Sequence, residues 1–292
     1  MWKQSSYNEA EANGTGALYL VPTPVGNLED MTFRAVRILK ESDLIAAEDT
    51  RQTKKLCSHF EISTPLTSYH EHNKEQSGKK LIEELKAGKQ VALVTDAGMP
   101  GISDPGYDLA VLCIEEQIRV IPLPGASAAL PAVAASGLST EMFTFYGFLP
   151  RGKKERKEQL QRLSAFPSTL IFYEAPHRIK ETIGAMIEML GDRKAVTVRE
   201  LSKRYEEFCR GTLSELLTHF EQNDIRGEFC LVVEGAGPGA LSEETPWWEE
   251  LELNSHVDHY INEGMKPKDA IKAAATDRGL PKRDVYQAYH VE

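Results

Sequence analysis

The sequence predicts an α/β protein with two α/β domains followed by a small helical module. Short apolar runs alternate with amphipathic helical stretches along residues 17–235, which indicates mostly parallel sheets covered by helices. The Gly-rich segment 235–239 marks a linker, and the residues beyond it follow helical patterns alone. We expect a disordered tail at 1–16, domains at 17–122 and 123–235, a linker at 236–246, and the helical module at 247–292.

Composition limits the class of protein. The chain has 292 residues and a formal net charge of −10, with 41% hydrophobic residues, enough for a core in each domain. No stretch approaches ~20 consecutive apolar residues and the N-terminus lacks an apolar signal segment, so we expect a soluble cytoplasmic protein without membrane contact. The four cysteines lack paired spacing, which predicts neither a metal site nor a disulfide framework. Because the chain is acidic, any contact with a nucleic acid would require a local basic patch.

The first domain alternates strands with helices. Its apolar strand runs are Ala17 to Val21, Leu44 to Ala47, Val91 to Val94 and Arg119 to Pro122. The helical stretches are Thr32 to Glu41, Gln52 to Phe60, Lys74 to Ala87 and Tyr107 to Glu116. In the first helix Phe33, Val36 and Leu39 recur at helical spacing, so one face is predicted to pack on the sheet.

The second domain is predicted to hold a mixed sheet. Its strands are expected at Phe143 to Phe148, Thr169 to Tyr173 and Ala195 to Val198, with helices at Ala126 to Gly137, Lys154 to Leu163 and Pro176 to Leu190. Two more strands, Glu206 to Gly211 and Glu228 to Glu234, flank a helix at Leu213 to Gln222, which suggests antiparallel strands at the end of the sheet. After the linker, helices are expected from Trp247 to Asn262, from Lys266 to Thr276 and from Pro281. The last two of these helices, separated by a turn at Gly279, resemble a helix-turn-helix. The alternative is a small helical cap that packs on the body of the protein.

The segment Val94 to Gly106 is the most informative loop. It follows a buried strand and contains three glycines and two prolines before the next helix. Glycine lets the backbone approach a ligand closely, and Asp96 stands at the carboxyl end of the strand, where open α/β sheets bind ligands. Asp96 there suits a ribose hydroxyl or a cation. The alternative is a tight strand-to-helix turn whose aspartates only cap helices.

Four segments together resemble a known family. They are Pro22 to Asp30, Ala47 to Arg51, the loop Val94 to Gly106, and Pro124 to Ala128. In this order and spacing they resemble the tetrapyrrole-methylase superfamily and, within it, the ribosomal RNA small subunit methyltransferase I family. The resemblance covers about Leu18 to Gly235. It implies two α/β domains with a cofactor cleft between them, and 2′-O-methylation of the ribose of a decoding-centre cytidine in 16S ribosomal RNA.

The resemblance also implies a cofactor and a set of residues that bind it. S-adenosylmethionine is expected in the cleft. Position matching assigns to it Pro24, Val25, Asp96, Gly98, Met99, Ser127, Ala128, Tyr173, Glu200 and Glu228. The partners that it implies are 16S ribosomal RNA or the small ribosomal subunit, and a second copy of the chain. The small-residue helix Ala126 to Gly137 offers a surface for that homodimer.

A ribose hydroxyl is a poor nucleophile at neutral pH, so alignment and a general base are both expected to contribute. The candidate bases are Asp49, His70 and His72; lone histidines are more often surface residues. Phosphate contacts are expected from Arg51, whose guanidinium offers a bidentate fork. The run Arg151 to Lys157 adds five cations, namely Arg151, Lys153, Lys154, Arg156 and Lys157, and Arg199, Lys203 and Arg204 extend it. A solvated helix start is the alternative for this run.

Two other functions compete with ribose methylation. Tetrapyrrole carbon methylation keeps the fold, but those relatives usually carry a first loop ending in Gly-Pro-Gly-Asp, whereas this chain has Pro22-Thr23-Pro24-Val25-Gly26-Asn27. A non-enzymatic regulator that binds nucleic acid through the tail leaves the loop Val94 to Gly106 without a purpose. Both are therefore disfavoured.

Overall fold

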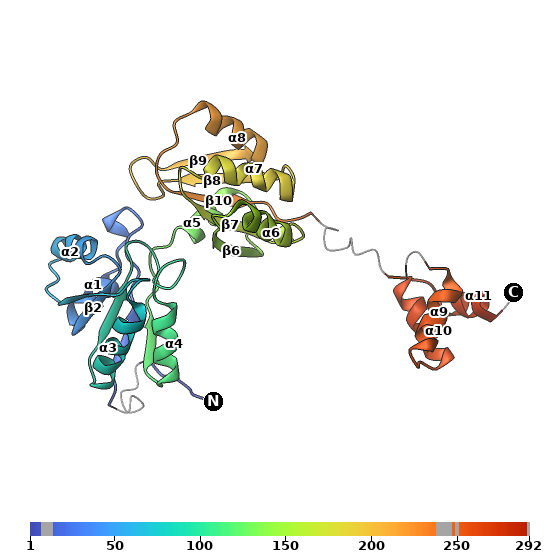
Figure 1. The fold of residues 1–292 in the computed structure, drawn as a ribbon, viewed down its shortest axis with the longest axis horizontal. Helices are drawn as coiled ribbons and strands as arrows, with labels where there is room; N and C mark the ends of the chain where they lie inside the picture. Colours follow the sequence, from blue (N-terminus) through green and yellow to red (C-terminus); the bar gives the residue numbers. More distant parts are fainter. Residues whose placement is uncertain (7–13, 238–246, 249–250, 291–292) are drawn as a thin grey trace. The chain divides into compact units, whose positions relative to one another are not determined.

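The computed structural model describes residues 1–6, 14–237, 247–248 and 251–290 (Figure 1). The chain divides into two compact units, Met1–Gly235 and Ala236–Glu292. Both sheets lie in the first unit, and the predicted helical module lies in the second. Among the described residues, no helix has the length and apolar character needed to cross a membrane. The predicted linker lies mostly outside the described residues.

The first sheet is parallel throughout, with strand order β3-β2-β4-β1-β5. Its strands are β1 (Ala17–Leu20), β2 (Leu44–Ala47), β3 (Leu66–Ser68), β4 (Val91–Val94) and β5 (Arg119–Pro122). Its helices are η2 (Leu28–Asp30), α1 (Phe33–Glu41), α2 (Thr50–His59), α3 (Lys74–Lys86) and α4 (Tyr107–Glu115). The alternation of strand and helix that the sequence predicts is confirmed. The three-residue strand β3 was not predicted, because its run is too short to show a period.

Alternate side chains of the strands supply two cores. On one face, Ala17, Ile45 and Val94 pack with helices α1 and α2. On the other face, Leu18 and Leu93 pack with helices α3 and α4. Because side chains point to opposite faces at successive strand positions, both faces bury apolar surface, as the continuous apolar runs predict. At the edge of the sheet the Gln4 side chain forms two 2.9 Å hydrogen bonds with the Val120 backbone. The expectation of a disordered tail at residues 1–16 does not account for this contact. Residues 7–13 lie outside the described part of the chain.

The second sheet is mixed, with strand order β6-β7-β10-β8-β9. Its strands are β6 (Phe143–Phe148), β7 (Thr169–Glu174), β8 (Lys194–Arg199), β9 (Glu207–Thr212) and β10 (Phe229–Val233). Strands β9 and β10 are antiparallel to their neighbours, as predicted. The prediction that both lie at the end of the sheet is wrong for β10, which occupies the centre. All five of its side chains are buried, and only a strand covered on both faces has such a pattern.

Helices cover both faces of the second sheet. Helices α6 (Lys153–Leu163), α7 (Ile179–Leu190) and α8 (Leu213–Gln222) supply one core with Phe172, Leu231 and their neighbours. Helix α5 (Ala129–Ser136) covers the other face through Ala129, Ala132 and Val133. The small residues of α5 that suggested a dimer contact therefore pack on the chain's own sheet, and Leu130 lies on the exposed side.

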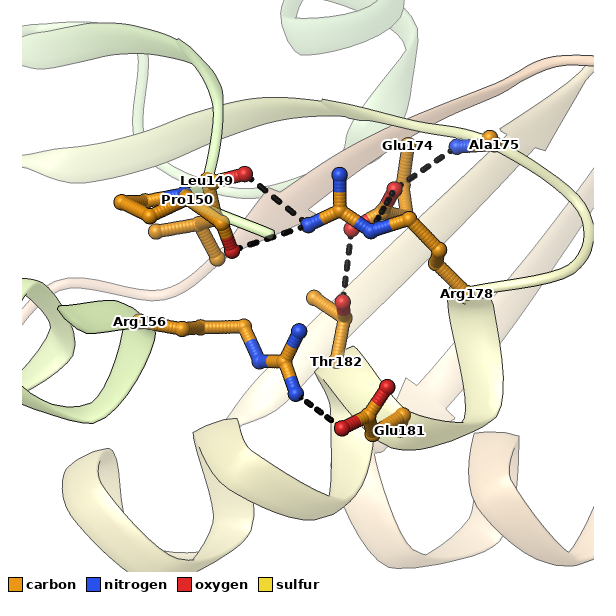
Figure 2. A network of polar contacts seen from close by, with 8 residues as sticks. All are labelled: Leu149, Pro150, Arg156, Glu174, Ala175, Arg178, Glu181 and Thr182. Atoms are coloured by element: carbon orange, nitrogen blue, oxygen red, sulfur yellow. Dashed lines mark hydrogen bonds and ion pairs between the residues drawn. The ribbon is translucent and has the colours of Figure 1, made fainter. Parts of the chain in front are cut away.

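A buried carboxylate anchors the segment that joins β6 to α6. Glu174 at the end of β7 is 2% exposed and receives hydrogen bonds from the Ala175 backbone N–H at 2.8 Å and the Thr182 hydroxyl at 2.6 Å. Its cationic partner is Arg178, whose Nε lies 3.4 Å from Oε1 (Figure 2). The Arg178 guanidinium also donates to the carbonyls of Leu149 and Pro150, at 2.9 and 3.1 Å. The network thereby fixes the backbone that enters the basic run.

The second unit is a small three-helix module. It comprises α9 (Leu253–Asn262), α10 (Pro267–Asp277) and α11 (Lys282–His290) around Val257, Ile271 and Ala274. His256 is fully buried beneath the stacked ring of Trp248, and its Nδ1 accepts a 3.1 Å hydrogen bond from Arg278. Trp247 also contacts the His256 ring. Both tryptophans lie before α9 begins, so the prediction that the helix starts at Trp247 is wrong.

We predict that Arg178→Ala lowers the free energy of unfolding of the first unit by about 3 kcal/mol, because it leaves the buried Glu174 carboxylate without its cation. Urea titration followed by circular dichroism measures this change. Arg37→Ala is the matched control: it removes an exposed pair with Glu41 and is expected to cost less than ~1 kcal/mol. Equal losses in the two variants would contradict the anchoring role.

Candidate active site

The loops that follow β1 and β4 are joined by backbone hydrogen bonds. The Thr23 N–H donates to the Gly98 carbonyl at 3.0 Å, and the Gly98 N–H donates back to Thr23 at 2.9 Å. The Thr23 hydroxyl adds a 2.9 Å bond to the carbonyl of Thr95. Gly98 has φ +76° and an open space where a side chain would begin, a conformation that glycine adopts without strain. Pro24 and Val25 are thereby held beside the loop that carries Asp96, Gly98 and Met99.

Residues that follow β5 and β7 approach the same loops. Gly125 lies against the ring of Pro22. Ser127 and Ala128 lie just before helix α5, and the backbone N–H groups of Ala128 and Ala129 are close enough to the Tyr173 hydroxyl to act on its pKa. Burial raises the pKa of Tyr173 to about 12, so the hydroxyl is neutral. The structure therefore brings Ser127, Ala128 and Tyr173 close together.

Glu200 and Glu228 form a third part of the site. The Glu228 backbone N–H donates to the Glu200 carboxylate at 3.0 Å, and Lys203 Nζ lies 3.1 Å from Glu200 and 3.8 Å from Glu228. Burial raises the pKa of Glu200, but the Glu228 N–H and the Lys203 ammonium outweigh it and hold that pKa below its ordinary value. The Lys203 stem fills the space beside Gly26, where a Cβ would lie 2.2 Å from it. This contact links the first loop to the second sheet.

Three carboxyl groups of the site form no ion pair within the described part of the chain. Burial raises the pKa of Glu48, which receives the Asp96 backbone N–H at 3.3 Å, and burial also raises the pKa of Asp96. Asp104 shows the largest change: burial, with the charges of Glu48, Asp96 and Glu228 nearby, raises its pKa to about 7. With Glu228 these carboxyl groups come from three loops: Glu48 follows β2, Asp96 and Asp104 follow β4, and Glu228 precedes β10. Their shared negative potential makes the site suited to a cationic ligand.

Asp104 and Glu48 were not assigned by position matching. Asp104 belongs to the Gly- and Pro-rich loop that the sequence singled out, and Glu48 directly precedes Asp49. Their approach to Glu228, more than a hundred residues further along the chain, depends on the fold and has no local signal. A perturbed carboxyl group among others of like charge is typical of functional sites.

Asp49 and Arg51 form a pair of their own. Asp49 caps the N-terminus of α2 by accepting the Arg51 N–H at 2.8 Å, and its two oxygens receive Arg51 Nε and Nη2 at 3.0 and 2.6 Å. These bonds lower the pKa of Asp49 to about 2. A carboxylate held in this way is a weak proton acceptor at neutral pH. The Arg51 side chain is 87% exposed, so it remains accessible from solvent although it is paired with Asp49.

The two candidate histidines differ in position. The charge of His70 is close enough to Glu48 to act on its pKa, and His70 Nδ1 is buried with no hydrogen-bond partner among the residues that the structure describes. His72 is exposed, 6.0 Å from His70 between ring centroids. The structure therefore brings His70, and not His72, to the acidic cluster.

The basic run divides into exposed and buried cations. Arg151, Lys153 and Lys154 are exposed beyond the anchored Leu149 and Pro150 backbone. The inclusion of Arg156 in the RNA patch is wrong, because its side chain is 1% exposed and pairs with Glu181 (Figure 2). Lys157 lies 2.5 Å from Glu188 and is occupied by that pair. Helical spacing explains the difference, since Arg156 points to the side of α6 that packs on α7.

The chain has the fold of a methylase, and its sequence matches one over most of its length. Residues 17–217 match the family described as Tetrapyrrole (Corrin/Porphyrin) Methylases. Cobalt precorrin-4 methyltransferase has a similar structure, with a TM-score of 0.57 and 18% identity over 77% of this chain and 96% of the other. Uroporphyrin-III C-methyl transferase from Thermus thermophilus, solved in complex with S-adenyl homocysteine, gives a TM-score of 0.53 and 18% identity over 75% and 97%.

A more specific relation comes from sequence. The protein named Ribosomal RNA small subunit methyltransferase I of Bacillus subtilis (strain 168) is 58% identical over 290 residues, which cover 99% of each chain. The chain belongs to the ribosomal RNA small subunit methyltransferase I family of the tetrapyrrole methylases. The resemblance drawn from the four loop segments is confirmed.

We predict that Asp104→Asn stabilises the first unit relative to wild type at pH 8 but not at pH 4. A carboxyl group with a folded pKa of about 7, above its ordinary 3.8, contributes fully to stability below pH 3.8 and loses that contribution as pH rises to about 7. Urea unfolding at the two pH values measures the difference. Asp224→Asn removes an exposed carboxylate and serves as the baseline. A difference that does not change with pH would contradict the raised pKa.

Proposed function

We propose that this chain transfers a methyl group from S-adenosylmethionine to the 2′-oxygen of a decoding-centre cytidine in 16S ribosomal RNA. The names of its relatives support small-subunit ribosomal RNA as the substrate class. The observation that carries the proposal is the acidic cluster of Glu48, Asp96, Asp104 and Glu228 beside the open Gly98 loop. It matches the positive charge of the cofactor. A cytoplasmic location and action on free RNA or on the assembled subunit are part of the proposal.

The cofactor set of the first domain comprises Pro24, Val25, Asp96, Gly98 and Met99, and that of the second comprises Ser127, Ala128, Tyr173, Glu200 and Glu228. When bound, S-adenosylmethionine supplies an electrophilic methyl group on a sulfonium cation. The carboxylates of Asp96 and Glu228 favour binding of that charge, while the Gly98 backbone leaves room for close approach. A group that stabilises the bound cofactor and the transition state equally does not raise the rate of the chemical step. These groups therefore contribute mainly to the affinity for the cofactor.

Removal of the ribose proton needs a group that accepts it at neutral pH. Asp104 fits this role better than Asp49, because its pKa of about 7 lies near the working pH whereas that of Asp49 is about 2. His70 is the second candidate, since its unpartnered Nδ1 lies near the same carboxyl cluster. A cation bound beside Asp104 favours its ionised form, which is the form that accepts a proton.

The RNA backbone is proposed to contact Arg51 and the exposed cations Arg151, Lys153 and Lys154. The Phe148 ring at the end of β6 contacts Tyr173 at 5.7 Å between centroids, which connects the strand before this basic segment to the cofactor set. In a protein of net charge −10, such a segment attracts phosphate locally. A homodimer remains part of the proposal, with the exposed Leu130 side of α5 as its contact.

The acceptor atom has a direct test. RNA with one 2′-deoxy substitution at the target nucleotide is expected to bind with near-normal affinity, because phosphates supply most of it, yet to accept no methyl group there. Small subunits reconstituted with such RNA, incubated with labelled S-adenosylmethionine, measure both properties. Methyl transfer to the deoxy substrate at the normal rate would refute ribose methylation. Labelling of uroporphyrinogen instead of RNA would establish the competing carbon methylation.

We predict that Asp104→Asn slows the chemical step by about 10²- to 10⁴-fold in single-turnover assays, the usual contribution of a general base. In wild type the rate is expected to rise with pH as Asp104 ionises and to level below the ligand-free pKa of about 7, because the bound cation favours the ionised form; the variant is expected to lose this rise. Asp49→Asn and His70→Gln are the comparison variants. A loss confined to His70→Gln would transfer the role to that histidine.

Replacing Arg151, Lys153 and Lys154 with Gln is expected to weaken RNA binding and to flatten its salt dependence by roughly one unit of slope for each lost phosphate contact. Filter binding at several salt concentrations measures the slope. Lys157→Gln is the matched control on the same helix, because Glu188 already occupies that ammonium. If the triple variant and the control behave alike, the segment is only a solvated helix start.

A further inference from the structure

One face of the edge strand β9 carries a carboxylate and a thiol that meet an imidazole from helix α8. Glu207 and Cys209 are two positions apart on β9, so their side chains point to the same face of the sheet. His219 lies on α8, which begins directly where β9 ends, at the capping residue Thr212. In the described part of the chain, this is the one group of three such side chains close enough to share a metal ion. The sequence predicted no metal site, because the spacing of these residues matches no metal motif.

The distances between the three ligand atoms fit a common metal ion. Cys209 Sγ lies 3.7 Å from Glu207 Oε1 and 3.9 Å from His219 Nε2, and all three atoms lie within 4.8 Å of one another. Around a tetrahedral zinc ion with bonds of about 2.0 to 2.3 Å, neighbouring ligand atoms are about 3.3 to 3.8 Å apart. The side chains therefore need only small movements to close on an ion.

A neighbouring side chain orients one of the three ligands. The second oxygen of Glu207, Oε2, is held by Arg199 Nη2 at 3.2 Å, which leaves Oε1 directed to the thiol. His219 Nε2 is the ring nitrogen that faces Cys209, while Nδ1 lies 3.4 Å from the Asn223 side-chain nitrogen, which can only donate. Because metal binding at Nε2 places the ring proton of neutral His219 on Nδ1, the Asn223 side chain must turn its oxygen toward Nδ1 when the metal binds. Partners of this kind fix the orientation of ligands in metal sites.

We propose that Glu207, Cys209 and His219 bind a divalent transition metal, with zinc as the preferred ion and one coordination position open to solvent. A thiolate, an imidazole and a carboxylate together suit zinc, whereas magnesium and calcium prefer oxygen ligands alone. On binding, the Cys209 thiol forms a bond from sulfur to the metal and releases its proton to solvent. The ion joins the edge strand β9 to α8, so its effect is on stability and it is independent of methyl transfer.

Titration of the reduced full-length chain with Co²⁺ tests the site, because a bound thiolate gives a charge-transfer absorption that other ligands do not. Wild type is expected to show this band and to lose it when Zn²⁺ displaces the cobalt. Cys209→Ser is expected to abolish the band. His219→Ala and Glu207→Gln are each expected to weaken cobalt binding by at least about tenfold, because even the replacement of a residue that only orients a metal ligand costs that much affinity. Zn²⁺ is expected to raise the melting temperature of wild type and not of Cys209→Ser.

Two control variants remove a thiol or an imidazole elsewhere. Cys57→Ser and His72→Ala are expected to retain the cobalt band, since neither residue belongs to the cluster. Absence of the band in wild type would overturn the proposal. Persistence of the band in Cys209→Ser would also overturn it, because another cysteine would then be the ligand. Cys209→Ser changes one atom of the side chain, and its circular dichroism spectrum verifies that the variant is folded.

Discussion

The two hydrogen bonds between Thr23 and Gly98 are the constraint on which the site depends. Parallel strands bring their carboxyl ends to one edge of the sheet, but the loops that leave them are free to diverge unless something joins them. The Thr23 and Gly98 pair joins the loops after β1 and β4, and a third bond to Thr95 holds the base of the second loop. Asp96 and Asp104 are carried by the loop fixed in this way.

The site combines two opposite electrostatic requirements. A cationic cofactor calls for carboxylates, and an RNA backbone repels them. Burial separates the two demands in part: Glu48 and Asp104 are partly withdrawn from water, whereas Asp96, Arg51, Lys153 and Lys154 are exposed to it. Charges in water are screened within about 10 Å at moderate salt, so an exposed cation interacts mainly with the charges close to it, as Arg51 does with Asp49 and Asp96.

Local patterns in the sequence predicted most of the fold, because strand and helix periods depend on neighbours in the chain. These patterns did not predict the central place of strand β10, because the order of strands in a sheet is set by contacts between distant segments. They also missed strand β3, because its apolar run is too short to show a period. The same division holds for the site. The loop Val94 to Gly106 and Asp96 were visible in composition, whereas the burial of Arg156 depends on the packing of α6 against α7. The approach of Asp104 to Glu228, and the cluster of Glu207, Cys209 and His219, arise only when distant segments fold together.

The tryptophans of the second unit have a practical consequence for optical spectroscopy. Two of the three tryptophans of the chain, Trp247 and Trp248, lie against His256 in that unit, and the third is Trp2 near the N-terminus. Neither sheet of the first unit contains one. Intrinsic fluorescence therefore reports chiefly on the helical module, and far-ultraviolet signals report chiefly on the larger unit. Comparing the two signals gives a label-free measure of whether the two units melt cooperatively.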